Sequence, residues 1–175
     1  MIKKINKLEK LPIKDKFNKG FTLVEILVYM ALMSIFLMVL LDVFTITLNT
    51  KLTSESNSTV IQDSRYILSK LLYDINNADS ITSPVLGATD SSLQIVSGGV
   101  TNVYMLINGN LVKIDSGISM NLNSVDTQLD SISFKNIGNV DGKPTIQVVY
   151  TVRSKIIVQG RETQILTINT TAGTR

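Results

Sequence analysis

The longest unbroken apolar stretch of the chain covers residues 21–41. Of these 21 residues, only Thr22, Glu25 and Ser34 are not apolar. As an α-helix that rises about 1.5 Å per residue, the stretch would be about 31 Å long, close to the hydrocarbon thickness of a bilayer. The pattern therefore predicts a transmembrane helix in this segment.

The pattern then changes without a helix-breaking residue, since no proline or glycine occurs between residue 41 and Pro84. Apolar side chains between residues 60 and 75 recur at the spacing of a helix with one buried face. We therefore expect one helix over residues 21–78, transmembrane over 21–41 and amphipathic over 42–78. The buried stripe would consist of Val60, Ile61, Ile67, Leu68, Leu71, Leu72 and Ile75, and the opposite side, turned to solvent or a partner, of Gln62, Asp63, Ser69, Lys70, Asp74 and Asn76.

Residues 79–175 consist of short apolar runs between turn residues, which is typical of antiparallel strands. Two of these runs flank Asn108-Gly109-Asn110, a strong hairpin signal. We expect strands at 103–107, 111–114, 132–135, 146–152 and 165–170, turns at Asp141-Gly142 and near Gly160, and polar loops at 87–92 and 121–128. A sheet that lays its apolar face on the helical stripe would bury both surfaces. The predicted fold class is α+β, a long N-terminal helix packed on a C-terminal antiparallel β-sheet head over residues 79–175.

The charge of the chain is concentrated before the apolar stretch. Residues 1–20 carry seven lysines against Glu9 and Asp15, a net charge of +5. Because lysine-rich flanks stay in the cytoplasm, we expect the N-terminus inside and everything from Asp42 onward outside the cytoplasmic membrane. From Val43 onward, ten basic and ten acidic residues balance, so the exposed part is formally neutral.

The junction between this leader and the apolar stretch reads Gly20-Phe21-Thr22-Leu23-Val24-Glu25. A secretory signal has its small-residue cleavage site after the apolar region, and no such site follows Leu41. The sequence favours cleavage between Gly20 and Phe21 instead. The leader, residues 1–20, would then be removed and the apolar helix would stay on the mature protein.

This six-residue pattern resembles the prepilin motif of type IV pilins and type II secretion pseudopilins. The resemblance implies that prepilin peptidase recognises Gly20, that the new N-terminal Phe21 is N-methylated, and that Glu25 contacts another pilin or pseudopilin subunit. A carboxylate in the bilayer core costs about 3 kcal/mol and usually has a partner. The amine of Phe21 on a neighbouring subunit is the available one; the alternative is that Glu25 snorkels to the membrane interface.

A second resemblance, to minor pilins and J-type minor pseudopilins, rests on residues 65–68, residues 74–78 and the hairpin at 104–111. It implies a structural subunit of a type IV pilus or a type II secretion-like filament. A DNA-uptake (competence) or adhesion subunit is the alternative reading within the same family.

The composition restricts catalysis, because the chain has no cysteine and no histidine. Thiol chemistry and the commonest general base are therefore absent, which leaves only carboxylate or Ser-Lys schemes. We find no clustered acid–base pair in the sequence and expect no enzyme, no catalytic residue and no cofactor. A signal-anchored ectoenzyme is the less favoured alternative.

Two further groups of charged residues are weaker signals. Asp126, Asp130 and Asp141 could ligate calcium, but they lack EF-hand spacing, so we predict no metal site. Residues 143–175 carry a net charge of +4, which could attract nucleic acid. Because the whole exposed part is neutral, we expect no nucleic-acid partner.

Overall fold

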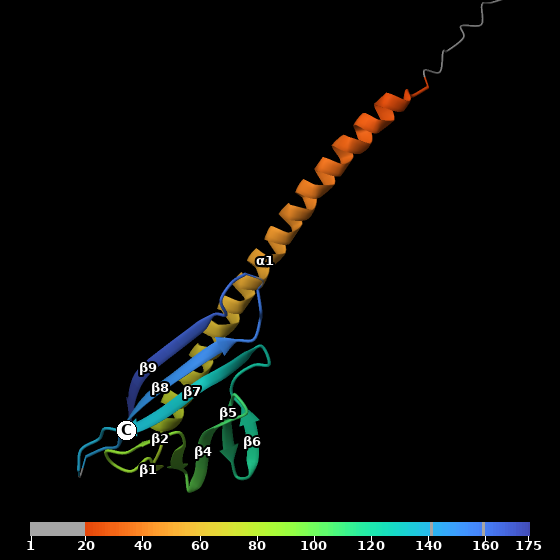
Figure 1. Cartoon of the computed structure of the whole chain (residues 1–175). Coiled ribbons are helices and arrows are strands. Elements are labelled where there is room, and N and C mark those ends of the chain that lie inside the picture. Colours follow the sequence, from red (N-terminus) through yellow and green to blue (C-terminus); the bar gives the residue numbers. More distant parts are fainter. Residues whose placement is uncertain (1–19, 141, 159) are drawn as a thin grey trace, which may run out of the picture. The chain divides into compact units, whose positions relative to one another are not determined.

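The structure of the chain is a computed structural model that describes residues 20–140, 142–158 and 160–175 (Figure 1). It contains a long helix, α1 (Leu23–Asn76), followed by antiparallel strands β1 to β9. The chain divides into two compact units, Met1–Phe44 and Thr45–Arg175. The second unit, called the head below, contains the C-terminal part of α1 together with the strands. The predicted α+β fold is confirmed.

The strands of the head form two sheets. The five-stranded sheet has the order β1 (Ser80–Ser83), β3 (Leu93–Ser97), β4 (Val100–Ile107), β5 (Asn110–Asp115) and β6 (Ile118–Asn121). The four-stranded sheet has the order β2 (Thr89–Asp90), β7 (Thr127–Asn136), β8 (Thr145–Ser154) and β9 (Ile165–Gly173). The expectation of one sheet is therefore wrong. After β6 the chain leaves the first sheet. Where the two sheets meet, the Leu129 amide nitrogen donates a hydrogen bond to the Gly109 carbonyl oxygen, at 2.8 Å.

The predicted hairpin is confirmed and becomes β4 and β5. Ile107 pairs with Asn110 across the turn. Asn108 and Gly109 have φ angles of 50° and 77°. A two-residue hairpin turn of the favoured twist requires positive φ at both central positions, and asparagine followed by glycine tolerates this best.

The three other predicted strands lie within β7, β8 and β9, and a turn is present at Gly160, whose φ is 75°. Residue Asp141 of the other predicted turn lies outside the described residues. The strands β1, β2, β3 and β6 were not predicted. The predicted loop at 87–92 contains β2, and the one at 121–128 overlaps the end of β6 and the start of β7, so both are wrong in part. These segments are short, and each pairs with a neighbouring strand.

One face of α1 supplies the core of the head. Its buried residues are Ser56, Val60, Ser64, Ile67, Leu71 and Ile75. The four apolar members pack in one cluster with side chains from both sheets, among them Leu93, Tyr104, Phe134, Val148 and Tyr150. Ile61 was predicted to belong to this face but is 42% exposed. At 3.6 residues per turn it lies about 120° around the helix from Ile67, which explains the error.

At Ser64, a small residue on this face, the helix backbone comes close to β8. The Tyr150 hydroxyl donates a hydrogen bond to the Ser64 carbonyl oxygen at 2.7 Å. Burial raises the pKa of Tyr150 to about 12. The small residue thus admits a large buried side chain from the sheet.

Asp63 and Asp74 were expected to face away from the sheets. Both instead form hydrogen bonds between α1 and the rest of the head. The Asp63 carboxylate accepts hydrogen bonds from the Ser124 amide, the Ser124 hydroxyl and the Thr127 hydroxyl. Asp74 accepts from the Tyr104 hydroxyl and from Lys113 Nζ, the latter at 3.2 Å. Both acids are only about 20° to 40° from Ile67 around an ideal helix, so they border the buried stripe.

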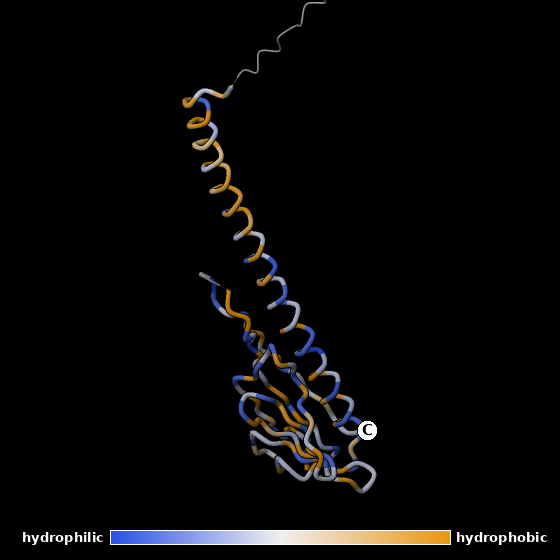
Figure 2. The backbone as a smooth tube through the Cα atoms, turned by 90° about the vertical axis from the view of Figure 1, so that its right-hand side faces the viewer, coloured by the Kyte–Doolittle hydropathy of each residue, from blue (hydrophilic) through white to orange (hydrophobic). Residues whose placement is uncertain are grey.

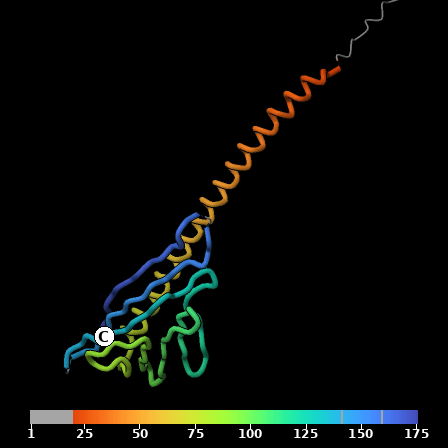
Figure 3. Tube along the Cα trace, viewed as in Figure 1, coloured from red at the N-terminus to blue at the C-terminus, as the bar shows by residue number. Residues whose placement is uncertain are grey.

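The end of the chain returns to the end of the helix (Figure 3). The Arg175 amide donates to the Asn76 carbonyl at 3.2 Å, and the Asn77 amide donates to the Tyr73 carbonyl at 3.1 Å. Carbonyls of a last helical turn lack partners within the helix. These bonds satisfy them, and α1 ends at Asn76, two residues before the predicted end.

The packing of α1 predicts that Leu71→Asp unfolds the head. Leu71 is 1% exposed, and an unpaired carboxylate there costs several kcal/mol, comparable with the whole stability of a small domain. Urea denaturation of a fragment that begins at Thr45, followed by circular dichroism, measures the loss. Ser69→Asp is the matched control, because Ser69 is exposed on the same helix. Lys70 is unsuitable, because its Nζ pairs with Asp74 at 3.3 Å. Equal stability of both variants would contradict this packing.

Candidate functional site

The candidate site is the start of α1, where the predicted cleavage motif lies. Gly20, Phe21 and Thr22 precede the helix and are exposed. The Thr22 hydroxyl accepts a hydrogen bond from the Glu25 amide at 3.2 Å, and the Thr22 carbonyl accepts one from the Ile26 amide, also at 3.2 Å. Thr22 is therefore the N-cap of α1. The cap fixes the helix start at Leu23, so the Gly20–Phe21 peptide bond stays outside the helix.

Nothing within the described fold requires glycine at residue 20. A Cβ added there would meet no described atom within 4 Å. A requirement for a small residue at this position must therefore come from a molecule that recognises the chain.

The Glu25 carboxylate has a partner one turn along the helix. The Tyr29 hydroxyl donates a hydrogen bond to Glu25 Oε1 at 3.1 Å. The Phe21 ring packs edge-on against the Tyr29 ring, with centroids 6.5 Å apart and an interplanar angle of 77°. Residues 21, 25 and 29 follow each other at intervals of four and so share one helix face. Tyr29 thus contacts both the Phe21 ring and the Glu25 carboxylate.

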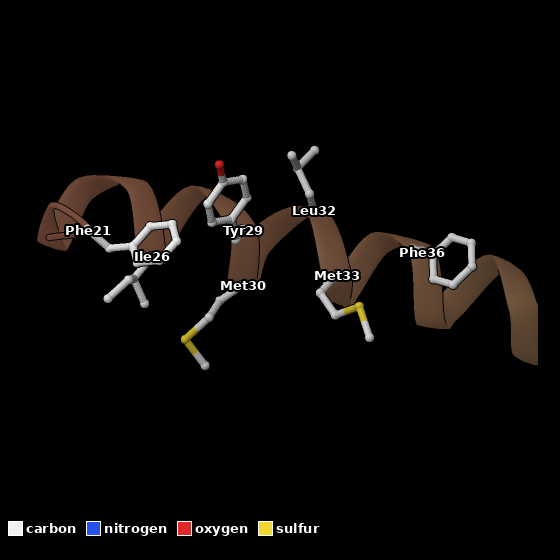
Figure 4. A pocket seen from close by; sticks show the side chains of 7 residues that line it. All are labelled: Phe21, Ile26, Tyr29, Met30, Leu32, Met33 and Phe36. Atoms are coloured by element: carbon white, nitrogen blue, oxygen red, sulfur yellow. The ribbon is translucent and has the colours of Figure 1, made fainter. Parts of the chain in front are cut away.

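The first unit exposes apolar side chains all around α1 (Figure 2). A shallow apolar concavity on it is lined by Phe21, Ile26, Tyr29, Met30, Leu32, Met33 and Phe36 (Figure 4). By its length and composition, α1 could cross a membrane. Its most apolar part is not buried within the described structure. Lipid or the apolar surface of another molecule is what such a helix accepts.

A family comparison agrees with the position of this site. Residues 15–41 match the model of the prokaryotic N-terminal methylation motif. The chain carries the prepilin motif of type IV pilins and pseudopilins. No curated protein and no solved structure matches the chain. The resemblance inferred from the six residues is therefore confirmed over the N-terminal region, and the fold of the head rests on its own structure.

The motif is the one carried by pilin-type and pseudopilin-type substrates of prepilin peptidase. The roles expected of Gly20, Phe21 and Glu25 within the motif stay predictions. What the structure adds is their surroundings. Gly20 and Phe21 are exposed and lie before the helix, and the Glu25 carboxylate already has one hydrogen-bond donor.

Of the acidic residues considered for calcium, the structure describes Asp126 and Asp130. The Asp130 carboxylate is held by Arg153, with Nη2 at 2.6 Å from Oδ2. The Asp126 carbonyl accepts from the Lys155 amide at 2.7 Å, and Asp141 lies outside the described residues. Among the residues described, no group of three or more acidic, histidine or cysteine side chains could hold a metal ion.

The basic residues between 143 and 175 do not gather into one surface. Lys143 and Arg175 lie at one end of the β8–β9 pair, whereas Lys155 and Arg161 follow the other end of β8. Arg153 is paired with Asp130. This distribution gives a phosphate backbone no continuous basic stripe to follow.

Two residues of the site were missed at the sequence level. Thr22 and Glu25 have the Thr-x-x-Glu spacing of a helix start, which could have identified the cap. Tyr29 was counted only among the apolar residues of the stretch 21–41. Its spacing of four from Glu25 was the available signal for a side-chain pair.

The cap predicts that Thr22→Val frays the start of α1. Losing an N-cap costs about 1 kcal/mol, so the Glu25 amide should exchange with solvent roughly fivefold faster. Hydrogen exchange of the full chain in detergent, read by NMR, measures this rate. Ser34→Ala is the control, because it removes a hydroxyl that bonds the Met30 carbonyl farther along α1. An unchanged Glu25 exchange rate in Thr22→Val would contradict the capping role.

Proposed function

We propose that the chain is a minor pilin or pseudopilin, a structural subunit of a type IV pilus or a type II secretion-like filament. The observation that carries this proposal is the prepilin motif placed directly before an uncovered apolar helix. Its work is assembly and not catalysis.

Maturation is the first step of the proposed role. Prepilin peptidase cuts between Gly20 and Phe21 and removes the lysine-rich leader. A protease needs its substrate backbone accessible, and the exposed, non-helical residues 20–22 supply that. Phe21 then becomes the N-terminus and is N-methylated.

Membrane anchoring follows from the same helix. Before it is removed, the leader places the N-terminus at the cytoplasmic side, as its net charge of +5 favours. The apolar part of α1 holds the mature subunit in the cytoplasmic membrane as a single-pass protein, and the head lies outside the cytoplasm until assembly.

Assembly uses the solitary carboxylate. In the membrane, before docking, the Tyr29 hydroxyl gives Glu25 one hydrogen bond. On entry into a filament, the cationic amine of Phe21 from a neighbouring subunit approaches Glu25, and the opposite charges form a pair in a medium of low dielectric constant. Other apolar helices replace the lipid around residues 23–44.

Processing predicts a size limit at residue 20. Gly20→Leu should block cleavage, because the bulky side chain clashes with the peptidase, while Gly20→Ala should still be cut. The chain itself has room for either side chain, so the fold is not at risk. Mass spectrometry of the membrane protein from cells that contain the peptidase should find an N-methylated Phe21 start. If the parent protein still begins with Met1 in these cells, the proposal is refuted.

Assembly predicts a separate defect for Glu25→Val. Membrane insertion should be equal or better, because a desolvated charge is gone, and cleavage at Gly20 should continue. Recovery in sheared filaments should fall, since the unpaired Phe21 amine of the neighbour costs about 3 to 5 kcal/mol. Immunoblots of the sheared and membrane fractions give both quantities.

Ser34→Val is the matched control for Glu25→Val. It also removes a polar group from the apolar helix, but a neutral one that bonds the Met30 carbonyl within its own helix. This control should enter filaments as the parent does. If the Glu25 variant is recovered from sheared filaments as fully as the control, Glu25 has no subunit partner and the snorkelling alternative holds.

A further inference from the structure

A polar recess lies in the head where α1 ends. It measures about 290 Å³ and is lined by the end of α1 and by β3, β4 and β5. Figure 1 labels β4 and β5 among these strands. The volume is at the lower limit of small-ligand sites, which span roughly 300 to 1,000 Å³, so the recess suits a single side chain.

One of the residues that line this recess has a buried acceptor without a partner. Asn102 is 7% exposed and lines the recess, and its Oδ1 atom makes no hydrogen bond to any described group. A buried polar atom without a partner is costly, and a donor from outside would satisfy it. Asn102 pairs directly with Asp115 across β4 and β5, so both side chains lie on the same face of the sheet.

The charges around the recess leave one carboxylate free. Asp74 forms ion pairs with both Lys70 and Lys113, at 3.3 and 3.2 Å. The Tyr104 hydroxyl also bonds Asp74, and burial together with this bond raises the pKa of Tyr104. Asp115 at the rim has no ion-pair partner among the described residues and accepts only the Ser116 hydroxyl, at 3.0 Å. The carbonyl end of α1 adds partial negative charge at the same place.

The surface next to the recess is apolar. A second, adjoining hollow is lined by Lys113, Asp115, Ser116, Ile118 and Met120, so the two hollows share Lys113 and Asp115. Ile118 is 73% exposed and Met120 is 50% exposed on the edge strand β6, and Tyr73 of α1 is 65% exposed beside the recess. A long side chain with an apolar stem and a cationic head would suit this surface. The stem would contact the apolar residues, and the head would bond Asn102 and Asp115.

We propose that this recess receives an arginine side chain of a neighbouring subunit, with the guanidinium bonded to Asn102 Oδ1 and Asp115 and the stem lying over Ile118 and Met120. The planar guanidinium offers five donors, which allows it to meet both acceptors at once, and its weak hydration favours burial over that of a lysine ammonium. Arginine with tyrosine and methionine is also the composition that protein interfaces favour. That the partner is a neighbouring subunit rests on the proposed function.

The binding chemistry is tested without filaments. The full chain in detergent micelles, labelled with ¹⁵N-asparagine, is titrated with n-propylguanidinium chloride, and the side-chain amide signal of Asn102 is followed by NMR. The signal should shift and saturate. Asp115→Asn should weaken the affinity about tenfold, because the charge-assisted bond is lost. Glu162→Gln, an exposed acid in the connection between β8 and β9, should leave the affinity unchanged.

Two other cations decide the chemistry of the recess. Tetramethylammonium carries the charge but has no N–H donor and should not produce the Asn102 shift. Calcium chloride tests for a metal site. An equal shift with tetramethylammonium, a tighter response to calcium, or no saturable shift with n-propylguanidinium would each overturn the proposal.

The identity of the partner is tested in cells with Asp115→Lys. This variant should be cleaved and anchored normally, but its recovery in sheared filaments should fall at least fivefold relative to Glu162→Lys. Full recovery of Asp115→Lys would refute the subunit contact and leave the filament role intact. Absence of the parent protein from filaments would instead refute the proposed function, while the guanidinium titration would still report on the recess.

Discussion

The structure depends on one helix that must satisfy two different surroundings. Up to about residue 44, α1 is apolar on every side, and its side chains are exposed (Figure 2). From Ser56 onward it buries one face in the core of the head. The hydrophobic effect drives both associations, but it acts around the whole circumference in the first part and along a single stripe in the second.

The polar residues of α1 lie where these surroundings require them. Glu25 has the Tyr29 hydroxyl as its donor, 3.1 Å away. Asp63 and Asp74, roughly three helical turns apart on the same face, bind the β6–β7 connection and the β4–β5 hairpin respectively. Because each acid bonds groups on a different part of the head, the pair fixes the rotation of the helix against both sheets. Apolar packing, which has no direction of its own, would not fix it as tightly.

Periodicity and short motifs in the sequence predicted the longer elements of the fold. The helix, the Asn108-Gly109 hairpin and the long strands β7, β8 and β9 were all foreseen, because each repeats its pattern over several residues. The strands β1, β2 and β3 were missed, because they are two to five residues long and are held by their neighbours. Asp63 and Asp74 were assigned to the wrong side, since a carboxylate beside an apolar stripe has no visible partner until the sheet is in place.

The candidate site shows the same division. Gly20, Phe21 and Glu25 follow from a motif, which the family comparison supports over residues 15–41. Thr22 and Tyr29 depend on which backbone and side-chain atoms meet at the helix start, and spacing alone did not single them out. The recess around Asn102 could not be predicted at all, because its walls come together only when the end of α1 packs beside β3, β4 and β5.

The central claim is that one helix meets lipid in its first part and the head in its second, and the absence of cysteine from the chain makes it directly measurable. Single cysteines at Ile35, Glu55 and Ser56 are treated with a membrane-impermeant maleimide, in cells whose cytoplasmic membrane is intact. We expect the cysteine at residue 55 to be labelled rapidly. The cysteine at residue 56 should be labelled only after denaturation, because Ser56 is 1% exposed. The cysteine at residue 35 should not be labelled until the membrane is dissolved. Equal labelling at residues 55 and 56 would show that α1 does not pack on the head, and rapid labelling at residue 35 would show that its first part is not in the membrane.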